Sequence, residues 1–316
     1  METGTSTRED GSGHIQLRSG DSSSGNSGDI DIHVGIGNSG AGGDVFFDAG
    51  DTSTSLTGGS ISLGAGYSVS ASSGGIVMKT VNAGTSGVSG ALSFTSGTTS
   101  RGASGSITFA TGTATNGKGG NIVLSVSPGT ESIDPTDTGG DVIVRAGDST
   151  GASGTGSGGA ISLTTGLGTE RSSGDFVVHT SNAGSSGVSG KLSFTSGTSS
   201  VGNSGLISMV TGAATNGKAG NIVFNPSSNS AGVGTAIDAH AGESTPLTGG
   251  ALSVTSGYGS TTSSGGVTFL TAEAGTAGVS GAIVVATGSA SSGSSGAYIF
   301  RTHAATGGKG GDFDVS

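Results

Sequence analysis

Apolar and polar residues alternate in a short pattern that returns every 15 or 16 residues along the chain. Ala91 to Gly105, ALSFTSGTTSRGASG, is one copy, and Ser106 to Gly120, SITFATGTATNGKGG, is the next. In each copy the second and fourth residues are apolar, whereas the third and fifth are mostly polar. Alternation with a period of two is typical of a β-strand, so every copy predicts one strand near its start.

The pattern extends over most of the chain, and we call each copy a repeat and number its positions from its first residue. Repeats begin at His14, Asp29, Asp44, Ser60, Gly75, Ala91, Ser106, Asn121, Asp141, Ala160, Asp175, Lys191, Leu206, Asn221, Ala236, Ala251, Gly266, Ala282, Ala297 and Asp312. The second position is apolar in all of them, and at the fourth only Ala239 is small. Glycine near position seven and at the end of the repeat predicts turns.

A single repeat cannot fold alone, because two buried side chains contribute roughly 3 to 6 kcal/mol whereas ordering fifteen residues costs about 15 to 30 kcal/mol. Stacking would pair each strand with the strands before and after it and align the apolar residues. The sequence therefore predicts an all-β fold, a single-domain parallel β-solenoid (β-helix) of about 20 coils with 15–16 residues per coil. We expect it to span 14–316, after a flexible N-terminal segment at 1–13.

A longer period of six repeats is superimposed on the short one. The six-repeat units are 60–159, 160–250 and a truncated copy, 251–316. The first unit is longer because two of its repeats, Asn121 to Gly140 and Asp141 to Gly159, carry extra residues, for which we expect protruding loops. Repeats of 16 residues, such as Gly75 to Gly90, are expected to carry a β-bulge.

Position ten is usually a serine or threonine. These hydroxyls form a candidate surface ladder, consisting of Ser100, Thr115, Thr150, Thr169, Ser200, Thr215, Ser230, Thr245, Ser260, Ser291 and Thr306. Position nine holds mainly small residues, and one of the two columns is expected to point inward. The sequence leaves open whether position ten forms an exposed hydroxyl array or an internal hydrogen-bonded ladder.

Charge and composition narrow the function classes. Glycine occurs 68 times, only 10% of residues are charged, cysteine is absent, and the net charge is -10. Without a basic cluster we expect no binding to nucleic acid. No apolar stretch approaches the roughly 20 residues of a transmembrane helix, so we expect no membrane insertion, and the start METGTSTREDGSG lacks the apolar run of a signal peptide.

Few side chains are candidates for chemistry. Asp31 with His33, and Asp238 with His240, place a carboxylate and an imidazole on one strand face, but each pair lacks a third ligand or a nucleophile, so we interpret them as exposed surface pairs. Residues 35–40 match the glycine fingerprint of dinucleotide sites, yet no helical pattern follows them. We predict no cofactor, no metal and no enzymatic activity.

Two stretches, GTSGVSGALSFTSGTTSRGASGSITFATG and GTATNGKGGNIVL, resemble the Gly/Ser/Thr-rich tandem repeats of surface proteins in microalgae such as diatoms. The resemblance covers most of the chain, is compositional, and implies a cell-surface or wall-associated location. The expected architecture is also similar to the antifreeze β-solenoids of insects and grasses. Those proteins display a regular hydroxyl face, whereas here charges interrupt positions three and five.

The sequence favours a non-enzymatic structural or adhesive repeat protein, extracellular or at the cell surface, that presents a stiff rod with Ser/Thr-rich faces. The alternative is an ice-binding (antifreeze) protein that uses the Ser/Thr ladder. Expected partners are further copies, joined end to end or laterally, or a surface polymer, a mineral or ice. Because the last repeat lacks a polar cap, we expect either that the chain is a fragment of a longer repeat array or that the rod associates end to end.

Overall fold

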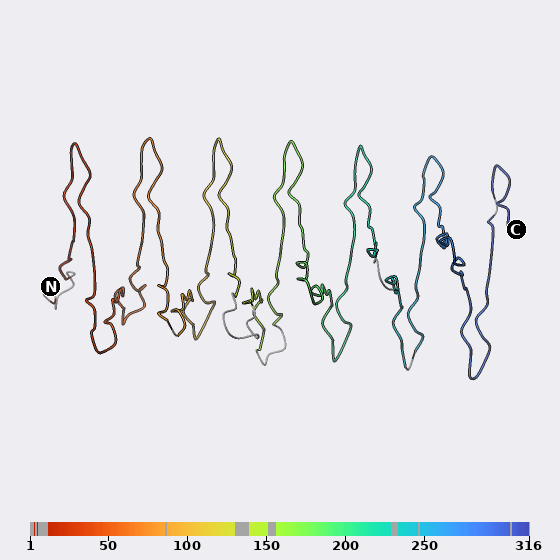
Figure 1. Ribbon diagram of the computed structural model, residues 1–316, viewed down its shortest axis with the longest axis horizontal. Coiled ribbons are helices and arrows are strands. Elements are labelled where there is room, and N and C mark those ends of the chain that lie inside the picture. Colours follow the sequence, from red (N-terminus) through yellow and green to blue (C-terminus); the bar gives the residue numbers. More distant parts are fainter. Residues whose placement is uncertain are drawn as a thin grey trace. The chain divides into compact units, whose positions relative to one another are not determined.

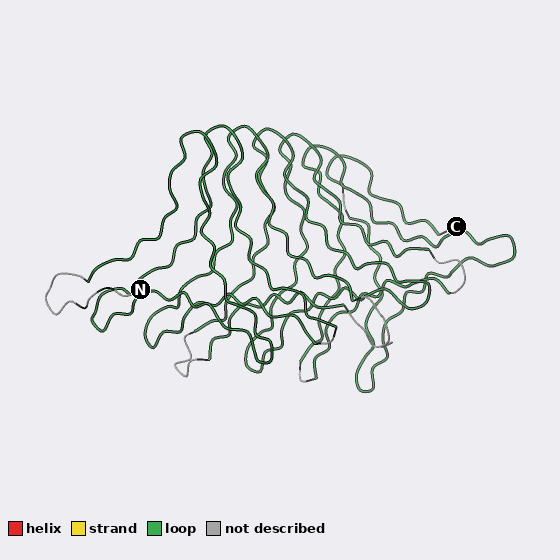
Figure 2. Cartoon of the chain, turned by 60° about the vertical axis from the view of Figure 1, so that its left-hand side comes forward, coloured by secondary structure: helices red, strands yellow, loops and turns green. Residues whose placement is uncertain are grey.

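The backbone of this protein consists of extended segments, bends and turns. The computed structural model describes residues 3, 5, 12–85, 87–129, 139–150, 156–228, 233–245, 247–303 and 305–315. Over these ranges there is no α-helix, β-strand or isolated β-bridge (Figure 2). The chain divides into two units, Met1–Ser162 and Leu163–Ser316, and the same local structure recurs in both.

The predicted parallel β-solenoid is therefore wrong. A solenoid requires each strand to donate and accept backbone hydrogen bonds with the strands before and after it. In the described part of the chain, no repeat is joined to another by such a ladder. The β-bulge predicted for the 16-residue repeats fails for the same reason, because a bulge needs a paired strand.

Among the described residues, the backbone hydrogen bonds between segments close a repeat on itself and do not join it to its neighbours. In six repeats the closing glycine donates its backbone N–H to the carbonyl of the glycine at position seven of the same repeat. These bonds are Gly59 to Gly50 (2.8 Å), Gly74 to Gly66 (2.9 Å), Gly159 to Gly147 (2.9 Å), Gly174 to Gly166 (3.1 Å), Gly250 to Gly242 (2.8 Å) and Gly265 to Gly257 (3.0 Å). We call the part of a repeat between position seven and its closing glycine the prong.

The closing glycine lies against the residue at position six in almost every repeat. A Cβ added at Gly120 would meet Thr111 Cγ2 at 3.3 Å, and one added at Gly105 would meet Ser96 Cβ at 3.7 Å. At Gly43 the added atom would come within 2.8 Å of Val34 Cγ1. The contact excludes a Cβ where it is as short as at Gly43, whereas at 3.7 Å, as at Gly105, it is an ordinary van der Waals distance.

In every described prong the chain bends at about positions ten to twelve of the repeat, for instance at 23–25, 115–117 and 215–217. Five of the bends contain a glycine with a positive φ angle, at Gly87, Gly102, Gly187, Gly202 and Gly293, and no other residue type adopts this conformation in the described part of the chain. These glycines occupy position twelve or thirteen, where the chain reverses.

No described residue is buried, but exposure follows the position in the repeat. The apolar residues of position two are 46–66% exposed, the valines of position three 74–82%, and three prong valines, Val88, Val188 and Val279, 94–95%. Intermediate exposure occurs only at positions six and nine, at Ser19, Ala49, Ala146, Thr165, Thr211, Ser256, Thr271, Ser68, Gly168 and Gly259. Position two is thus less exposed than the valines of position three, whereas the large apolar residues of position four, 48–81% exposed, overlap with those valines.

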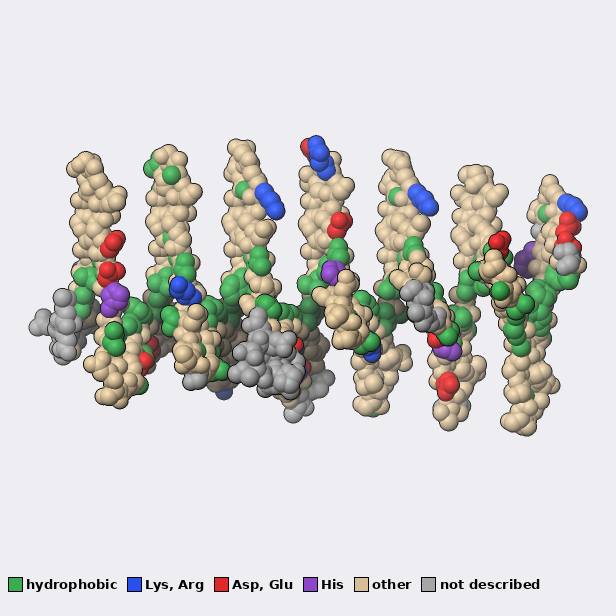
Figure 3. Space-filling model, viewed as in Figure 1, with side chains coloured by type: hydrophobic (Ala, Val, Ile, Leu, Met, Phe, Trp, Pro, Cys, Tyr) green, Lys and Arg blue, Asp and Glu red, His purple; other side chains and the backbone are tan. Residues whose placement is uncertain are grey.

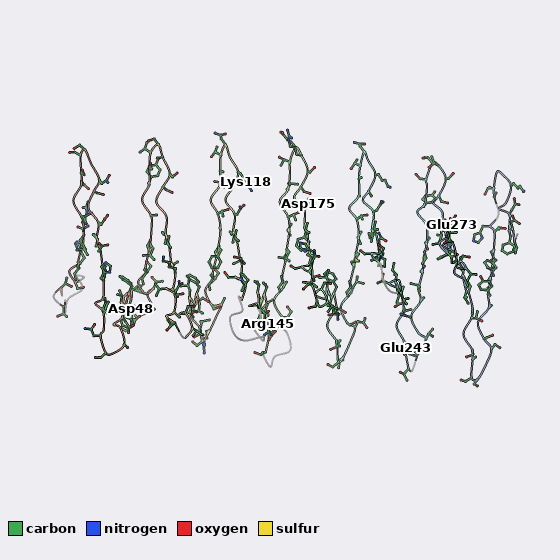
Figure 4. The ribbon with its side chains drawn as sticks, viewed as in Figure 1. Asp48, Lys118, Arg145, Asp175, Glu243 and Glu273 are labelled. Atoms are coloured by element: carbon green, nitrogen blue, oxygen red, sulfur yellow. The ribbon has the colours of Figure 1, made fainter. Side chains whose placement is uncertain are left out.

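Within each unit the prongs project from a base formed by the first positions of the repeats (Figure 1). Hydrophobic side chains gather at this base, whereas the outer parts of the prongs carry few of them (Figure 3). In the first unit, Asp48 and Arg145, both at position five, lie near the base, and Lys118, at position thirteen, lies far out on its prong (Figure 4). Two aromatic rings of consecutive repeats contact each other near the base: the ring centroids of Phe94 and Phe109 are 6.3 Å apart.

The base does not amount to a core. The chain exposes 30,926 Å², whereas a compact folded protein of this mass would expose about 11,500 Å². Of the other predicted features, the flexible segment 1–13 and the extra residues of the two long repeats lie largely outside the described residues. The boundary between the two units follows Ser162, close to the boundary between the six-repeat copies at 159 and 160.

Candidate functional site

The candidate site is the outer half of the prong, where the Ser/Thr ladder was expected. Position ten is the first residue of the bend in most repeats, so its side chain stands at the turning point of the prong. Ten of the eleven predicted ladder residues lie within the described ranges and are exposed; they are Ser100, Thr115, Thr150, Thr169, Ser200, Thr215, Thr245, Ser260, Ser291 and Thr306. Ser230 lies outside those ranges.

Position nine makes the hydrogen bonds that hold the bend. The backbone N–H of Gly25 donates to Ser22 Oγ (3.0 Å), that of Ala71 to Ser68 Oγ (3.0 Å), and that of Leu247 to Ser244 Oγ (3.2 Å). These bonds run from position twelve back to position nine. Serine and threonine stabilise turns in this way by replacing a backbone partner with a side-chain oxygen.

A second form of the same bend has the position-nine hydroxyl as the donor. Thr99 Oγ1 donates to the carbonyl of Arg101 at 2.7 Å, and Ser199 Oγ donates to the carbonyl of Val201 at 3.0 Å. Position nine therefore turns toward the backbone, and position ten is left for contacts outside the chain. The sequence indicated two columns of small or hydroxyl residues without showing which of them supports the turn.

Removing a position-nine hydroxyl should loosen its bend. We expect Ser68→Ala to weaken the bend of 60–74 by about 0.5–1.5 kcal/mol, because the Ala71 N–H loses its acceptor. Amide exchange at Ala71 measures the effect. Ser70→Ala, in the same bend, keeps the Ser68 hydroxyl and serves as control. Equal acceleration in both variants would contradict this role of position nine.

Where position nine is glycine, the backbone itself passes over it. A Cβ at Gly259 would meet the carbonyl oxygens of Ser263 (2.5 Å) and Thr262 (2.7 Å), and a Cβ at Gly37 would meet those of Gly40 and Ala41 at 3.1 Å each. Gly168 is overlaid in the same way by the carbonyls of Arg171 and Ser172. These carbonyls occupy the space that a side chain would need.

The candidate chemical groups do not form a catalytic or metal-binding constellation in the described residues. No group of three or more His, Asp or Glu side chains is placed to hold a metal ion there. Residues 35–40, which match the dinucleotide fingerprint, form a prong with a bend at 38–40, and no helix follows to receive a pyrophosphate. The Asp31/His33 and Asp238/His240 side chains are all exposed.

Two ion pairs occur among the described residues, and both are largely exposed to solvent. Arg145 and Asp148 approach to 3.9 Å, and Lys309 and Asp312 to 3.1 Å, with side chains 76–82% exposed. Exposed pairs of this kind contribute little to stability. They connect the base of a prong to its outer part or to the next repeat and mark no site.

One open hollow of about 490 Å³ is lined by Phe300, Arg301, Thr302 and Phe313. Two of the four lining residues are aromatic, and the ring centroids of Phe300 and Phe313 lie 5.3 Å apart. Tyr298, which does not line the hollow, contacts Phe300 with a centroid distance of 4.5 Å. It contains a single charged group, the Arg301 guanidinium. The hollow lies at the base of the last repeats and is distinct from the prongs.

The chain is therefore a tandem-repeat protein in which most repeats, where the structure describes them, form one small prong with a hydroxyl group at position ten. No protein-family model, curated protein or solved structure matches the chain. The described residues contain no helix that is long and apolar enough to cross a membrane.

Proposed function

We propose that this chain is a non-enzymatic structural or adhesive protein, located outside the cell or at its surface, that binds through its prongs. The observation that supports the proposal is repetition: the same bend, with an exposed serine or threonine at position ten, recurs in both units. One exposed hydroxyl binds weakly. Many identical hydroxyls on one chain bind strongly to a surface that repeats as well, because each attachment raises the effective concentration of the next.

The composition of the prong favours an uncharged, hydroxyl-rich partner such as a surface polysaccharide. Outer prong positions are dominated by glycine, serine and threonine, and only 10% of the whole chain is charged. Electrostatic attraction to polyanions is unfavourable at a net charge of -10. Binding through hydroxyl hydrogen bonds is therefore expected to depend only weakly on salt.

The test is an alanine series at position ten in the full-length chain. Variants with two, five and ten Ser/Thr→Ala changes among the described ladder residues are applied to a cellulose surface, and the retained fraction is measured. Because avidity multiplies individual affinities, we expect retention to fall more steeply than in proportion to the number of hydroxyls removed, by roughly tenfold or more for the ten-alanine variant.

A matched control removes hydroxyls at the base of the repeats instead of the prong tips. Ser93, Thr95, Ser193, Thr195 and Ser253 occupy positions three and five. Their replacement by alanine should leave retention unchanged within about twofold. The proposal fails if both sets weaken binding equally, or if the ten-alanine variant binds as well as the wild type. Thermal hysteresis that the ten-alanine variant loses would identify ice as the surface instead.

A further inference from the structure

The first three repeats carry a distinctive distribution of charge. We call residues 14–18, 29–33 and 44–48 the first, second and third segments; they are HIQLR, DIDIH and DVFFD. The first segment begins and ends with a basic residue, and the third begins and ends with an acidic one. The second begins with an aspartate and ends with a histidine. Acidic and histidine side chains accordingly follow one another at the base of the first unit (Figure 3).

All three segments are exposed and unpaired in the chain. None of their residues lies in a strand or bridge, so their backbone N–H and C=O groups face solvent. Among the described residues the ion pairs involve only Arg145, Asp148, Lys309 and Asp312. Unpaired extended backbone accepts another extended segment readily, by the same hydrogen bonds that join two strands.

The charges of the three segments are complementary when a second copy runs in the opposite direction. In an antiparallel pair, position one faces position five of the other segment. If the two-fold axis passes through Asp31, the second segment meets itself, so that Asp29 faces His33 of the second copy. Asp31, on the axis, faces Asp31 of the second copy, which is the single like-charge contact of this arrangement. The first segment then meets the third, with His14 opposite Asp48 and Arg18 opposite Asp44 of the second copy.

The apolar residues match under the same operation. Position two faces position four across the pair, which places Ile15 opposite Phe47 of the second copy and Leu17 opposite its Val45. Ile30 meets Ile32. These six side chains are 46–69% exposed in the single chain, and cross-strand pairs of branched and aromatic residues stabilise antiparallel strands.

We propose that two copies of this chain associate through residues 14–48 as a closed, two-fold antiparallel pair. Charge complementarity and the uncovered apolar side chains of the three segments together favour a second copy as the occupant.

Parallel association in register is disfavoured, because it places every charge of the three segments against its own copy. Like charges that face one another across strands are destabilising. A parallel arrangement displaced by two repeats brings the first segment against the third as well. It leaves the second segment opposite the neutral residues 60–64, and it is open-ended, so it would form growing chains of molecules instead of a dimer.

The test reverses one set of charges at a time in the full-length chain. Variant A is Asp44→Lys with Asp48→Lys, and variant B is His14→Asp with Arg18→Asp. Each variant alone sets like charges against each other at both ends of the interface. We expect the dissociation constant of each homodimer to rise by roughly tenfold to 100-fold at low salt, measured by sedimentation velocity and light scattering.

The mixture of the two variants is decisive. In a heterodimer of A and B, opposite charges face each other at both ends, so mixing should restore a dimer with an affinity within about threefold of the wild type. If mixing restores nothing, the charges act within one chain and the proposal is overturned. If it produces larger assemblies that grow with concentration, the closed two-fold arrangement is wrong.

A matched control changes the net charge equally and leaves the segments intact. Asp21→Lys with Asp51→Lys alters position eight of the first and third repeats, which lies on the prongs. We expect this variant to dimerise like the wild type, within about threefold. Weakening as large as that of variant A would show that net charge, and not its pattern, controls association, and would overturn the proposal.

Discussion

Gly259→Ala opens the prong of repeat 251–265. The added Cβ would lie 2.5 Å from the Ser263 carbonyl oxygen and 2.7 Å from that of Thr262. Both contacts are with backbone, so no side-chain rotation relieves them and the bend itself must move. We expect the hydrogen bond from Gly265 N–H to the Gly257 carbonyl, 3.0 Å long, to be lost in most molecules, which corresponds to a cost of about 2 kcal/mol or more.

Amide exchange at Gly265 measures this opening. The neighbouring repeat provides an internal reference, because Gly250 N–H donates to the Gly242 carbonyl at 2.8 Å in an independent prong. Gly257→Ala is the matched substitution, since nothing lies within 4 Å of a Cβ built there and its φ is not positive. Slow exchange at Gly265 in the Gly259→Ala variant would contradict the close backbone approach at position nine.

Gly43→Ala separates the two arms of the second repeat, and a second change brings them back. The added Cβ would come within 2.8 Å of Val34 Cγ1, a branched side chain with little freedom to turn away. We expect closure to weaken by about 1–3 kcal/mol. Val34→Ala removes the obstructing methyl group, so the double variant should close as well as the wild type, to within about 0.5 kcal/mol.

Contacts between the position-six side chain and the glycine α-protons, observed by nuclear Overhauser effects, report on the closure. The first repeat provides the control, because a Cβ at Gly28 would lie an ordinary 3.7 Å from Ser19 Cβ. Gly28→Ala should therefore be tolerated. If Val34→Ala fails to rescue Gly43→Ala, the closing glycine is required for a reason other than its contact with position six.

The period of the repeat could be predicted from the sequence, but its pairing could not. Position two, as at Ile107, is less exposed than the valines of position three, but position four, which includes Phe109, overlaps with them, so the alternation does not separate two sides of the segment. The inference of a solenoid required the strand to pair with another repeat. In the structure, the closing glycine instead forms a hydrogen bond with position seven of its own repeat. Pairing between repeats and closure within one repeat use the same turn residues, so periodicity alone does not distinguish them.

The candidate site could be predicted from the sequence only in part. The hydroxyl at position ten stood out because serine or threonine recurs there, and its exposure agrees with a surface role that remains a prediction. The role of position nine in stabilising the bend was missed, because no single residue type recurs there. Serine at Ser68, glycine at Gly259 and a small residue at Ala114 all occupy it. Position six carried a signal, because Ser, Thr, Ala and Val fill it in almost every repeat.

Because each closing hydrogen bond lies within a single repeat, the length of one prong does not depend on the length of the others. The glycines joined by the hydrogen bond from Gly159 to Gly147 are twelve residues apart in the sequence, and those joined by the bond from Gly74 to Gly66 are eight apart. Both hydrogen bonds are 2.9 Å long. The two arms thus meet in the same way in repeats of different length. A foreign peptide inserted between two such glycines should therefore leave the other prongs unchanged. The chain could display many copies of an epitope in this way.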